Sequence, residues 1–436
     1  MAKKIHQPHK FLQEEDLKPL HNLAYKTVLE LETQLGINAS GNQDRYAAFF
    51  GRDSMITCLK LLHVYKREPD EIFLRIIKKT IATAVRLQGK EINLSSGEKP
   101  GKIIHEYRES GYHHLTSRQK PWYIYPNKTL RNYDSVDATP LFLILAAEFY
   151  SSSKDKEFLK KIMPNVEKAF EYLYEFGPKG GNRLFLEYQL RRPAPYGGLV
   201  NQGWMDSIDS ILIYGEPPKE SVALVEVQAY YFKALKLWAK IYERTDKERA
   251  KKYELRSRLL KSEFNTTLLM RSENLFYLAY AIFGHKAEIL EVRSNPGHCL
   301  WAAVTTNGKY ESIIEDKYIP DIVSRLMKPD LFEPGAGIRT LSTKSKFFGP
   351  CSYHNGSIWP FDNGLITEGF ENFGFDEQAR KIKGSVLNAI IQFGSAVELF
   401  CADENGNIKE YTEKGSRHYG THKQAWTAAT ILDFTT

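Results

Sequence analysis

Cysteine is scarce in this chain: four of its 436 residues are cysteines, and no two of them form a CxxC pair. Such a scattered set does not build a disulfide scaffold, and it offers no cluster with the spacing of metal ligands. We therefore expect a reducing, cytoplasmic location and a protein that needs neither a metal ion nor another cofactor. The four cysteines are Cys58, Cys299, Cys351 and Cys401.

Long apolar runs are also missing. No segment approaches the roughly 20 apolar residues that a membrane-spanning helix needs. The basic residues near the N-terminus are not followed by the apolar stretch of a secretory signal. The net charge of +7 is mild for this length, and lysines and arginines are interspersed with acidic residues. These features predict a protein with no membrane segment and no nucleic-acid partner.

Linkers and alternating strands are few as well. Because no Pro/Ser-rich segment divides the chain, we predict a single domain over residues 1–436. Residues 183–188 and 274–281 alternate like strands, and we expect them to form short hairpins in loops. Other connections are too long to be idle turns, which favours a functional role for them. They cover residues 89–134, 191–202, 329–356 and 401–422.

Helical periodicity dominates the rest of the chain. Apolar residues recur at three- and four-residue steps, which predicts about a dozen helices, counting short ones. Paired helices at this density, with the loops gathering on one face, predict an all-α fold: an (α/α)6 toroid of six helical hairpins with minor β-hairpins in its loops. The helical segments are residues 17–35, 54–65, 70–87, 137–150, 155–176, 221–244, 247–268, 319–327, 357–373, 376–394 and 423–434.

Two acidic residues almost two hundred positions apart stand among aromatic and apolar neighbours. Asp206 follows Trp204 and Met205, and Glu398 is followed by Leu399 and a phenylalanine. An apolar environment can hold one carboxyl group protonated near neutral pH while another stays ionised. Two such groups on opposite sides of a sugar ring can hydrolyse a glycosidic bond.

Each of these acids has competitors nearby in the sequence. Asp209 lies three residues after Asp206 and could instead cap a helix. Three glutamates follow Glu398, but they lie in a polar loop, so Glu398 is the buried candidate of the four. These competitors are Glu404, Glu410 and Glu413.

Other segments carry candidate sugar-binding side chains. Arg52 and Asp53 place a fork of donors beside an acceptor, which suits two adjacent hydroxyls of a terminal sugar. A plain helix cap is the alternative for Asp53. Glu106 lies in the longest loop, as a subsite wall or as exposed surface. Asp137 precedes a helix, where one of the neighbouring polar residues is a cap.

Residues 351–363 combine aromatic rings with hydrogen-bonding side chains in only thirteen positions. Trp359 could stack on a sugar while His354 and Asn355 bind its hydroxyls. The alternative is a Trp-Pro turn packed on the core. This unusual composition favours a site, and Trp204 beside Asp206 belongs with the same group of candidate binding residues.

Taken in order, these segments resemble the glucosidase domain of glycogen-debranching enzymes of the amylo-α-1,6-glucosidase type. Single fragments are weak signals, but eight in the right order over roughly residues 45–434 are specific. They are Phe-Gly-Arg-Asp-Ser (50–54), His-Glu-Tyr-Arg (105–108), Ser-Val-Asp-Ala-Thr-Pro-Leu-Phe (135–142), Asn-Gln-Gly-Trp-Met-Asp-Ser (201–207), Val-Glu-Val-Gln (225–228), Gly-Ile-Arg-Thr-Leu-Ser (337–342), the run from Tyr353 to Asn363, and Glu-Leu-Phe-Cys (398–401) followed by Gln-Ala-Trp (424–426).

The resemblance implies a six-hairpin toroid and an inverting, exo-acting α-glucosidase. It assigns the general acid to Asp206 and the general base to Glu398, and it places Arg52 and Asp53 on the terminal glucose. The expected partner is a carbohydrate, either a glycogen-derived chain or a short α-glucoside.

The sequence also departs from the family pattern. It starts almost directly at the helical segments, and Ala396-Val397 stand where the family commonly has Leu-Pro. The loop at residues 402–422 is basic and longer than expected, and it could reshape the side of the site that holds the leaving group. Because the family's extra domain, which could hold a branched polymer, is not seen in this sequence, we expect short α-glucosides or limit-dextrin stubs to be preferred over intact glycogen. The alternatives are a hydrolase of a small glucoside or disaccharide without debranching activity, a sugar epimerase on the same fold, and a non-catalytic glucan-binding protein.

Overall fold

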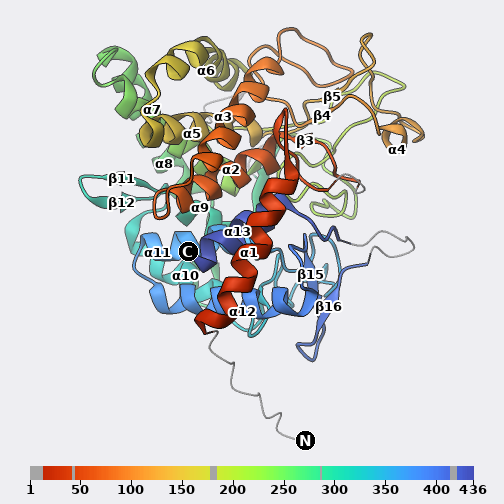
Figure 1. Ribbon diagram of the computed structural model, residues 1–436, viewed down its shortest axis with the longest axis vertical. Helices are drawn as coiled ribbons and strands as arrows, with labels where there is room; N and C mark the ends of the chain where they lie inside the picture. The colour runs from red at the N-terminus through yellow and green to blue at the C-terminus, as the bar shows by residue number, and fades with distance from the viewer. Residues whose placement is uncertain (1–12, 42–44, 177–183, 285–286, 413–419) are drawn as a thin grey trace, which may run out of the picture.

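Six helices form a closed inner ring in the computed structural model, which describes residues 13–41, 45–176, 184–284, 287–412 and 420–436. Each inner helix contacts the next, and the last one returns to the first. In Figure 1, the dark-blue α13 accordingly lies beside the red α1 and α2. The inner helices are α2 (Gly51–Tyr65), α5 (Ala138–Ser153), α7 (Val225–Tyr242), α9 (Pro296–Trp301), α11 (Pro360–Asn372) and α13 (Ala425–Thr435).

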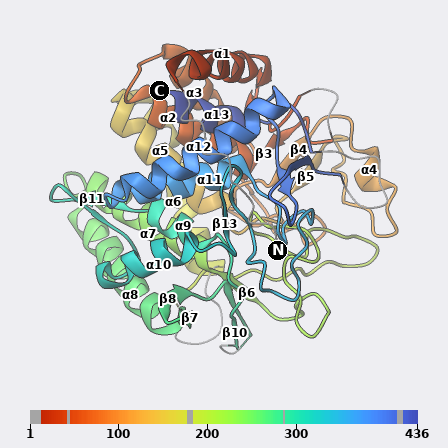
Figure 2. The ribbon, with the colours of Figure 1, turned by 90° about the horizontal axis from the view of Figure 1, so that it is seen from below.

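Six further helices pack around this ring. Figure 2 shows α1 against α13 and α12 beside α11, each pair in contact. The outer helices are α1 (Glu14–Leu31), α3 (Glu71–Arg86), α6 (Lys156–Phe176), α8 (Lys247–Thr267), α10 (Ile319–Leu326) and α12 (Asp376–Phe393), and the short α4 (His113–Thr116) lies in a loop. The predicted (α/α)6 toroid is confirmed.

The difference between inner and outer helices follows from their sequences. The inner helix α5 is apolar on nearly all sides and is buried from Ala138 to Ala147. A helix covered on every side needs such a composition, whereas an outer helix needs one apolar stripe. The outer helix α3 has that stripe, with Phe73, Ile76, Ile77 and Ile81 buried and lysines outside.

The strands are short and lie in the connections between helices. One three-stranded sheet has the order β3–β4–β5 and a second has the order β10–β9–β6. Antiparallel pairs join β1 to β2, β7 to β8, β11 to β12, β13 to β14, and β15 to β16. Their bounds are β1 (Glu32–Thr33), β2 (Gly36–Ile37), β3 (Phe49–Phe50), β4 (Glu106–Arg108), β5 (Leu130–Asn132), β6 (Val222–Leu224), β7 (Leu269–Ser272), β8 (Leu275–Leu278), β9 (Ala281–Phe283), β10 (Ala287–Ile289), β11 (Val304–Thr306), β12 (Lys309–Glu311), β13 (Phe332–Glu333), β14 (Gly337–Ile338), β15 (Phe400–Ala402) and β16 (Ile408–Glu410).

Periodicity in the sequence identifies the long helices and misses the short ones. All eleven predicted helical segments are helical within a few residues of their predicted ends, but α4 and α9 were not predicted. Both are too short to display a 3.6-residue repeat. Residues 274–281 contain β8, which pairs with β7, as expected for a hairpin. Residues 184–188 form no hairpin of their own; Tyr188 makes an isolated bridge to Val222.

The inner helices all run in the same direction. Their first turns meet at one end of the ring, where Arg52 of α2 contacts Asp137 at the start of α5. Their last turns meet at the other end, where His63 in the last turn of α2 contacts Asp433 of α13. Within the described part of the chain, no helix is long and apolar enough to cross a membrane.

Candidate active site

The first turns of the inner helices supply the polar side chains at one end of the ring. Arg52 and Asp53 lie in the first turn of α2, Asp137 directly precedes α5, and Glu226 lies in the first turn of α7. Helix N-termini carry a partial positive charge, so they suit acidic side chains. The remaining three inner helices are preceded by Asn295, Trp359 and Gln424.

Arg52 is the charged centre of this end of the ring. Its side chain is buried, and its Nε donates to Asp137 Oδ2 at 2.6 Å. Its Nη1 donates to Asp206 Oδ2 at 3.2 Å, and its Nη2 donates to the carbonyl oxygen of Gln202 at 3.4 Å. One guanidinium therefore joins α2 to the start of α5 and to the loop that carries Asp206.

Asp206 combines access to water with a raised pKa. Its side chain is 27% exposed, whereas that of Arg52 is 2% exposed. The surrounding protein raises the pKa of Asp206 to about 6, because burial outweighs the opposing effect of the Arg52 guanidinium. A carboxyl group with a pKa in this range can hold a proton and release it near neutral pH, as a general acid must.

Glu398 is held in a fixed orientation from two sides. The Tyr353 hydroxyl donates to Glu398 Oε1 at 2.7 Å, and the Thr421 backbone N–H donates to Glu398 Oε2 at 3.1 Å. The Glu398 backbone N–H in turn donates to the Thr421 carbonyl oxygen at 2.8 Å. Glu398 is buried, and it lies two residues before β15.

The charges of both acids act on the same two neighbours. The pKa of Asp53 is raised to about 8, mainly by burial, with the negative charges of Asp206 and Glu398 adding to the shift. The pKa of the Tyr46 hydroxyl is also raised, by burial first and then by Glu398 and Asp206. The contacts agree: His354 bonds the Ser207 backbone and the adjacent Tyr353 bonds Glu398, so Asp206 and Glu398 lie around one site although 192 positions separate them in the chain.

The aromatic candidates pack behind this site. Trp204, His354 and Trp359 are all buried. The His354 ring stacks on Trp359 with a centroid distance of 5.2 Å, and Trp204 meets both rings edge-on. Trp359 Nε1 donates to the Tyr353 carbonyl oxygen at 3.0 Å. This burial favours a supporting role for Trp359 over the predicted stacking on a sugar.

His354 and Asn355 hold the loop that carries Asp206. His354 Nδ1 accepts from the Ser207 backbone N–H at 3.2 Å, and burial keeps its pKa well below the usual value. Asn355 Oδ1 accepts from Arg293 at 2.7 Å, while its Nδ2 donates to the Asp209 carbonyl oxygen at 3.0 Å. Both ends of the Asn355 amide are used within the protein, so the structure favours positioning of this loop over binding of sugar hydroxyls.

Asp137 and Glu106 are both engaged in internal contacts. Asp137 accepts from Arg52 and, through its other oxygen, from the Ser135 hydroxyl at 2.5 Å. Glu106 lies in β4 and pairs with Arg108 of the same strand. Its position is directly opposite Phe50 of β3, two residues before Arg52. Glu106 therefore lies beside the site, and its ion pair is with Arg108.

Two tyrosines at the site were not predicted. Tyr353 belongs to residues 351–363, where the predicted sugar-binding residues are His354 and Asn355, which follow it, and Trp359. Tyr46 stands outside every motif, and its hydroxyl lies 3.4 Å from that of Tyr353. The signal that could have identified Tyr353 is its place directly before His354 in a segment rich in hydrogen-bonding residues.

A match to a known family agrees with this geometry. The sequence model of the amylo-alpha-1,6-glucosidase family matches residues 123–433. The chain belongs to this family. No curated protein matches the chain significantly.

Solved structures extend the comparison beyond the matched residues of the amylo-alpha-1,6-glucosidase family. The GH63 mannosylglycerate hydrolase of Thermus thermophilus, in complex with Tris and D-glycerate, matches with a TM-score of 0.64 at 12% identity, covering 96% of this chain and 100% of that one. A rhamnosidase from Klebsiella oxytoca with rhamnose bound matches with a TM-score of 0.57 at 13% identity, covering 97% and 64%. At these identities the likeness shows the shared fold. Together with the family match, it makes this protein a glycoside hydrolase.

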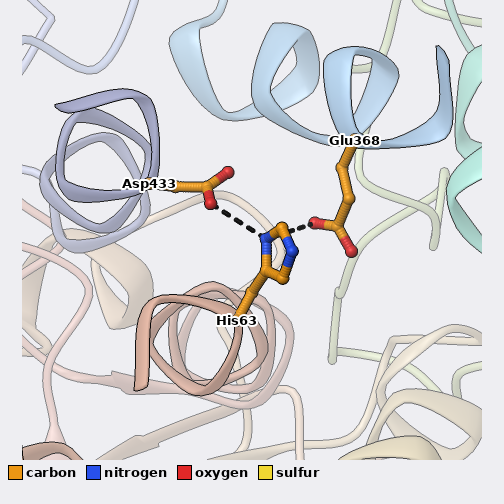
Figure 3. Close-up of side chains that lie close together, drawn as sticks. All are labelled: His63, Glu368 and Asp433. Atoms are coloured by element: carbon orange, nitrogen blue, oxygen red, sulfur yellow. Dashed lines mark ion pairs between the residues drawn. The ribbon is translucent and has the colours of Figure 1, made fainter. Parts of the chain in front are cut away.

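A second group of ligand-type side chains lies at the opposite end of the ring from these acids. Figure 3 shows His63 between Glu368 and Asp433, with its Nδ1 2.9 Å from Asp433 Oδ1 and 3.5 Å from Glu368 Oε2. The Lys60 ammonium bonds both carboxylates, and Arg67 also contacts Asp433. Two cationic side chains thus already supply the charge that a metal ion would bring, so we read this group as an ion-pair network.

Proposed function

We propose that this protein is an inverting, exo-acting α-glucosidase of the amylo-α-1,6-glucosidase type. Its substrates would be short α-glucosides or short chains derived from glycogen. The observation that carries the proposal is the pair of acids around one site, with the Asp206 pKa raised to about 6 and Glu398 oriented by Tyr353.

The two acids would have complementary roles. Asp206 would donate its proton to the glycosidic oxygen as the bond to the anomeric carbon breaks. Glu398 would take a proton from a water molecule, whose oxygen attacks the anomeric carbon from the opposite side. The products are one free glucose, with its anomeric configuration inverted, and the alcohol that left.

Arg52 and Asp53 would serve the terminal sugar in different ways. Arg52 is committed to Asp137 and Asp206, so its main effect is to position the acid and to lower the acid's pKa. Asp53, with a pKa raised to about 8, is protonated at neutral pH and can both donate to and accept from a sugar hydroxyl. In this proposal Asp53 is the direct ligand of the non-reducing glucose.

The epimerase alternative has less support. Such an enzyme would need a pair of bases to abstract and return a proton, and histidine is the usual choice. His354 is buried against Trp359 and bonded to Ser207, while His105 is buried with its pKa far below the usual value. Neither histidine is placed for that chemistry.

Glucose release from a panel of α-1,6- and α-1,4-glucosides and glycogen tests the proposal. Asp206→Asn and Glu398→Gln should each lower turnover by about 10²–10⁴, the range for loss of a positioned acid or base. Glu404→Gln is the matched control, because Glu404 is exposed on the loop between β15 and β16. Loss of activity in Glu404→Gln equal to that in Glu398→Gln would show that the base is misassigned.

A further inference from the structure

Arg293 is a buried cation whose side-chain hydrogen bonds go to uncharged acceptors. It lies in the connection between β10 and α9 and is 2% exposed. Its Nη1 donates to the His354 carbonyl oxygen at 2.9 Å and lies 3.5 Å from Met205 Sδ. Its Nη2 donates to the Ser210 carbonyl oxygen at 2.8 Å and to Asn355 Oδ1 at 2.7 Å. Both terminal nitrogens of the guanidinium are therefore used inside the protein.

Burial of a charge among neutral acceptors destabilises the fold. Moving the charge out of water is unfavourable, and neutral oxygens compensate for this less well than a carboxylate does. Burial accordingly lowers the pKa of the Arg293 guanidinium. Arg325, which is also buried, instead forms a two-pronged ion pair with Asp330. A departure of this kind from ordinary packing is expected at a functional site.

Two of the acceptors lie in the loop that carries Asp206. Met205 directly precedes Asp206, and Ser210 follows it four positions later. The Ser210 hydroxyl donates to the Met205 carbonyl oxygen at 2.6 Å, and the Ser210 backbone N–H donates to the Ser207 carbonyl oxygen at 3.1 Å. The loop therefore closes around Asp206, and Arg293 holds it by its backbone.

The other two acceptors lie in the segment that orients Glu398. They directly follow Tyr353, whose hydroxyl donates to Glu398 Oε1 at 2.7 Å. Glu398 has further support that does not involve Arg293, because its carboxylate also accepts from the Thr421 backbone N–H at 3.1 Å. Loss of the Arg293 contacts should therefore release the loop of Asp206 while Glu398 stays in place.

We propose that Arg293 is a positioning residue for catalysis, which fixes the loop of Asp206 against the segment that orients Glu398. The inference rests on the proposed function, since it concerns the distance between that acid and that base. Inverting enzymes keep their two carboxyl groups about 6.5–9.5 Å apart, so that a water molecule fits beside the sugar. A displacement of about 1 Å can lower turnover about 10²-fold, because the acid must reach the glycosidic oxygen.

Arg293→Lys tests the proposal, because lysine keeps the positive charge but loses the planar fork that reaches both segments. Two substrates separate the acid from the base. Isomaltose needs a proton on its leaving oxygen, whereas α-glucosyl fluoride releases fluoride with little help from an acid. We expect kcat to fall about 10²-fold or more for isomaltose and at most about tenfold for the fluoride. KM should change little for either substrate.

Arg325→Lys is the matched control. Arg325 lies in the last turn of α10, and its fork holds Asp330 instead of the two loops. Any fall in kcat should therefore be equal for the two substrates in this variant. An equal fall in Arg293→Lys would overturn the inference. If Arg293→Lys does not fold, Asn355→Ala takes its place, because it removes one acceptor of the guanidinium. The same inequality is then expected in milder form, and equal falls would again overturn the inference.

Hydrogen exchange separates this inference from the proposed function. In Arg293→Lys, the Ser207 and Ser210 amides, which are bonded within the site, should exchange faster than in wild type. The Glu398 amide, which donates to the Thr421 carbonyl oxygen, should exchange at the wild-type rate. If wild type released no glucose from either substrate, the proposed function would fail, and this pattern would still decide whether Arg293 fixes the loop. Unchanged exchange at Ser207 and Ser210 would overturn the inference.

Discussion

Asp206 owes its pKa to two opposing neighbours, the protein that covers it and the guanidinium of Arg52. Burial raises the pKa, and the positive charge of Arg52 lowers it, leaving a value of about 6. Asp137 adds a smaller upward contribution from the far side of Arg52. The acid is therefore tuned by a contact between the start of α2 and a loop about 150 residues further along the chain.

Replacement of Arg52 by glutamine tests this balance. The substitution removes the charge that favours ionised Asp206 and leaves Asp137 without its partner, so both effects raise the pKa of Asp206. Activity that requires protonated Asp206 is lost as pH rises through that pKa, so the alkaline limb of kcat/KM should move to higher pH. Total activity should fall as well, because the acid loses its orientation.

The measurement is the pH profile of kcat/KM for wild type, Arg52→Gln and the exposed control Arg244→Gln. An alkaline limb that stayed in place or moved to lower pH in Arg52→Gln would contradict the account of Asp206. The control should keep the wild-type limb.

The environment of an acidic residue can be predicted when its neighbours in the sequence are apolar. Asp206 follows a tryptophan and a methionine, and the raised pKa expected from that setting is present. The same reasoning does not separate a side chain that lines a site from one that supports it. Asn355 and Trp359 lie in the segment whose Tyr353 bonds Glu398, yet their own polar atoms are bonded inside the protein.

At the scale of helices, the inner helices share one direction, so the two ends of the ring carry opposite partial charges from the helix dipoles. The first turns carry Asp53 and Glu226, whereas Lys60 and His63 lie in the later turns of α2, towards the negative end of its helix dipole. Lys60 is the more buried of these two, and its ammonium bonds Glu368 at 2.9 Å and also Asp433. These bonds tie α2 to α11 and α13.

Lys60→Met should destabilise the protein strongly. Loss of the ammonium leaves the buried Asp433 and the partly buried Glu368 with less compensating charge. Breaking a buried ion pair typically costs about 3–5 kcal/mol. Lys66→Met, directly after the same helix, is the control, because Lys66 is 46% exposed in its pair with Glu148. Such a pair is worth about 0–1 kcal/mol. Denaturant unfolding should rank the variants in this order, and equal stabilities would contradict the structural role of Lys60.

Close packing within the ring depends on glycine at the contact of α11 with α13. A Cβ atom on Gly364 would lie 2.7 Å from Thr430 Cγ2 and 2.8 Å from its Oγ1. The Thr430 hydroxyl donates to the Trp426 carbonyl oxygen at 2.8 Å, so this side chain is not free to turn away. The two helices must therefore separate if Gly364 gains a side chain.

Gly364→Ala should lower the free energy of unfolding by about 1–3 kcal/mol, as overpacking does. Gly384→Ala on the outer helix α12 is the matched control, because nothing lies within 4 Å of its added Cβ. Alanine should stabilise that helix by about 0.5–1 kcal/mol. Thermal or denaturant unfolding gives the comparison, and a Gly364→Ala protein as stable as wild type would contradict the packing described.

The sequence predicted the long helices well. It did not predict the short helices or the short strands, and it placed the helix ends less accurately. Long amphipathic segments such as α6 and α8 repeat often enough to be recognised, whereas α9 has six residues and no full repeat. The two- and three-residue strands are set by contacts between distant loops. Pairing of β4 with β3 on one side and β5 on the other, which brings Glu106 beside Phe50, has no local signal in the sequence.

For the whole molecule, closure of the ring makes the site. Arg52 lies near the N-terminus and Glu398 near the C-terminus, and contact between α2 and α13 brings their segments together. Paired helices in sequence predict a toroid, but they do not state which residues meet when it closes. The resemblance to the family supplied the pairing of Asp206 with Glu398, and their catalytic roles stay a prediction. The assignment of one domain over residues 1–436 also stays a prediction.

The measurement that tests the central claim most directly is the anomeric form of the first glucose released. Proton NMR during hydrolysis of an α-glucoside distinguishes the two anomers before they interconvert. If Asp206 donates the proton while Glu398 activates water on the opposite side, β-glucose appears first and α-glucose accumulates only by later interconversion. α-Glucose as the first product would show retention of configuration and would contradict the roles given to both acids.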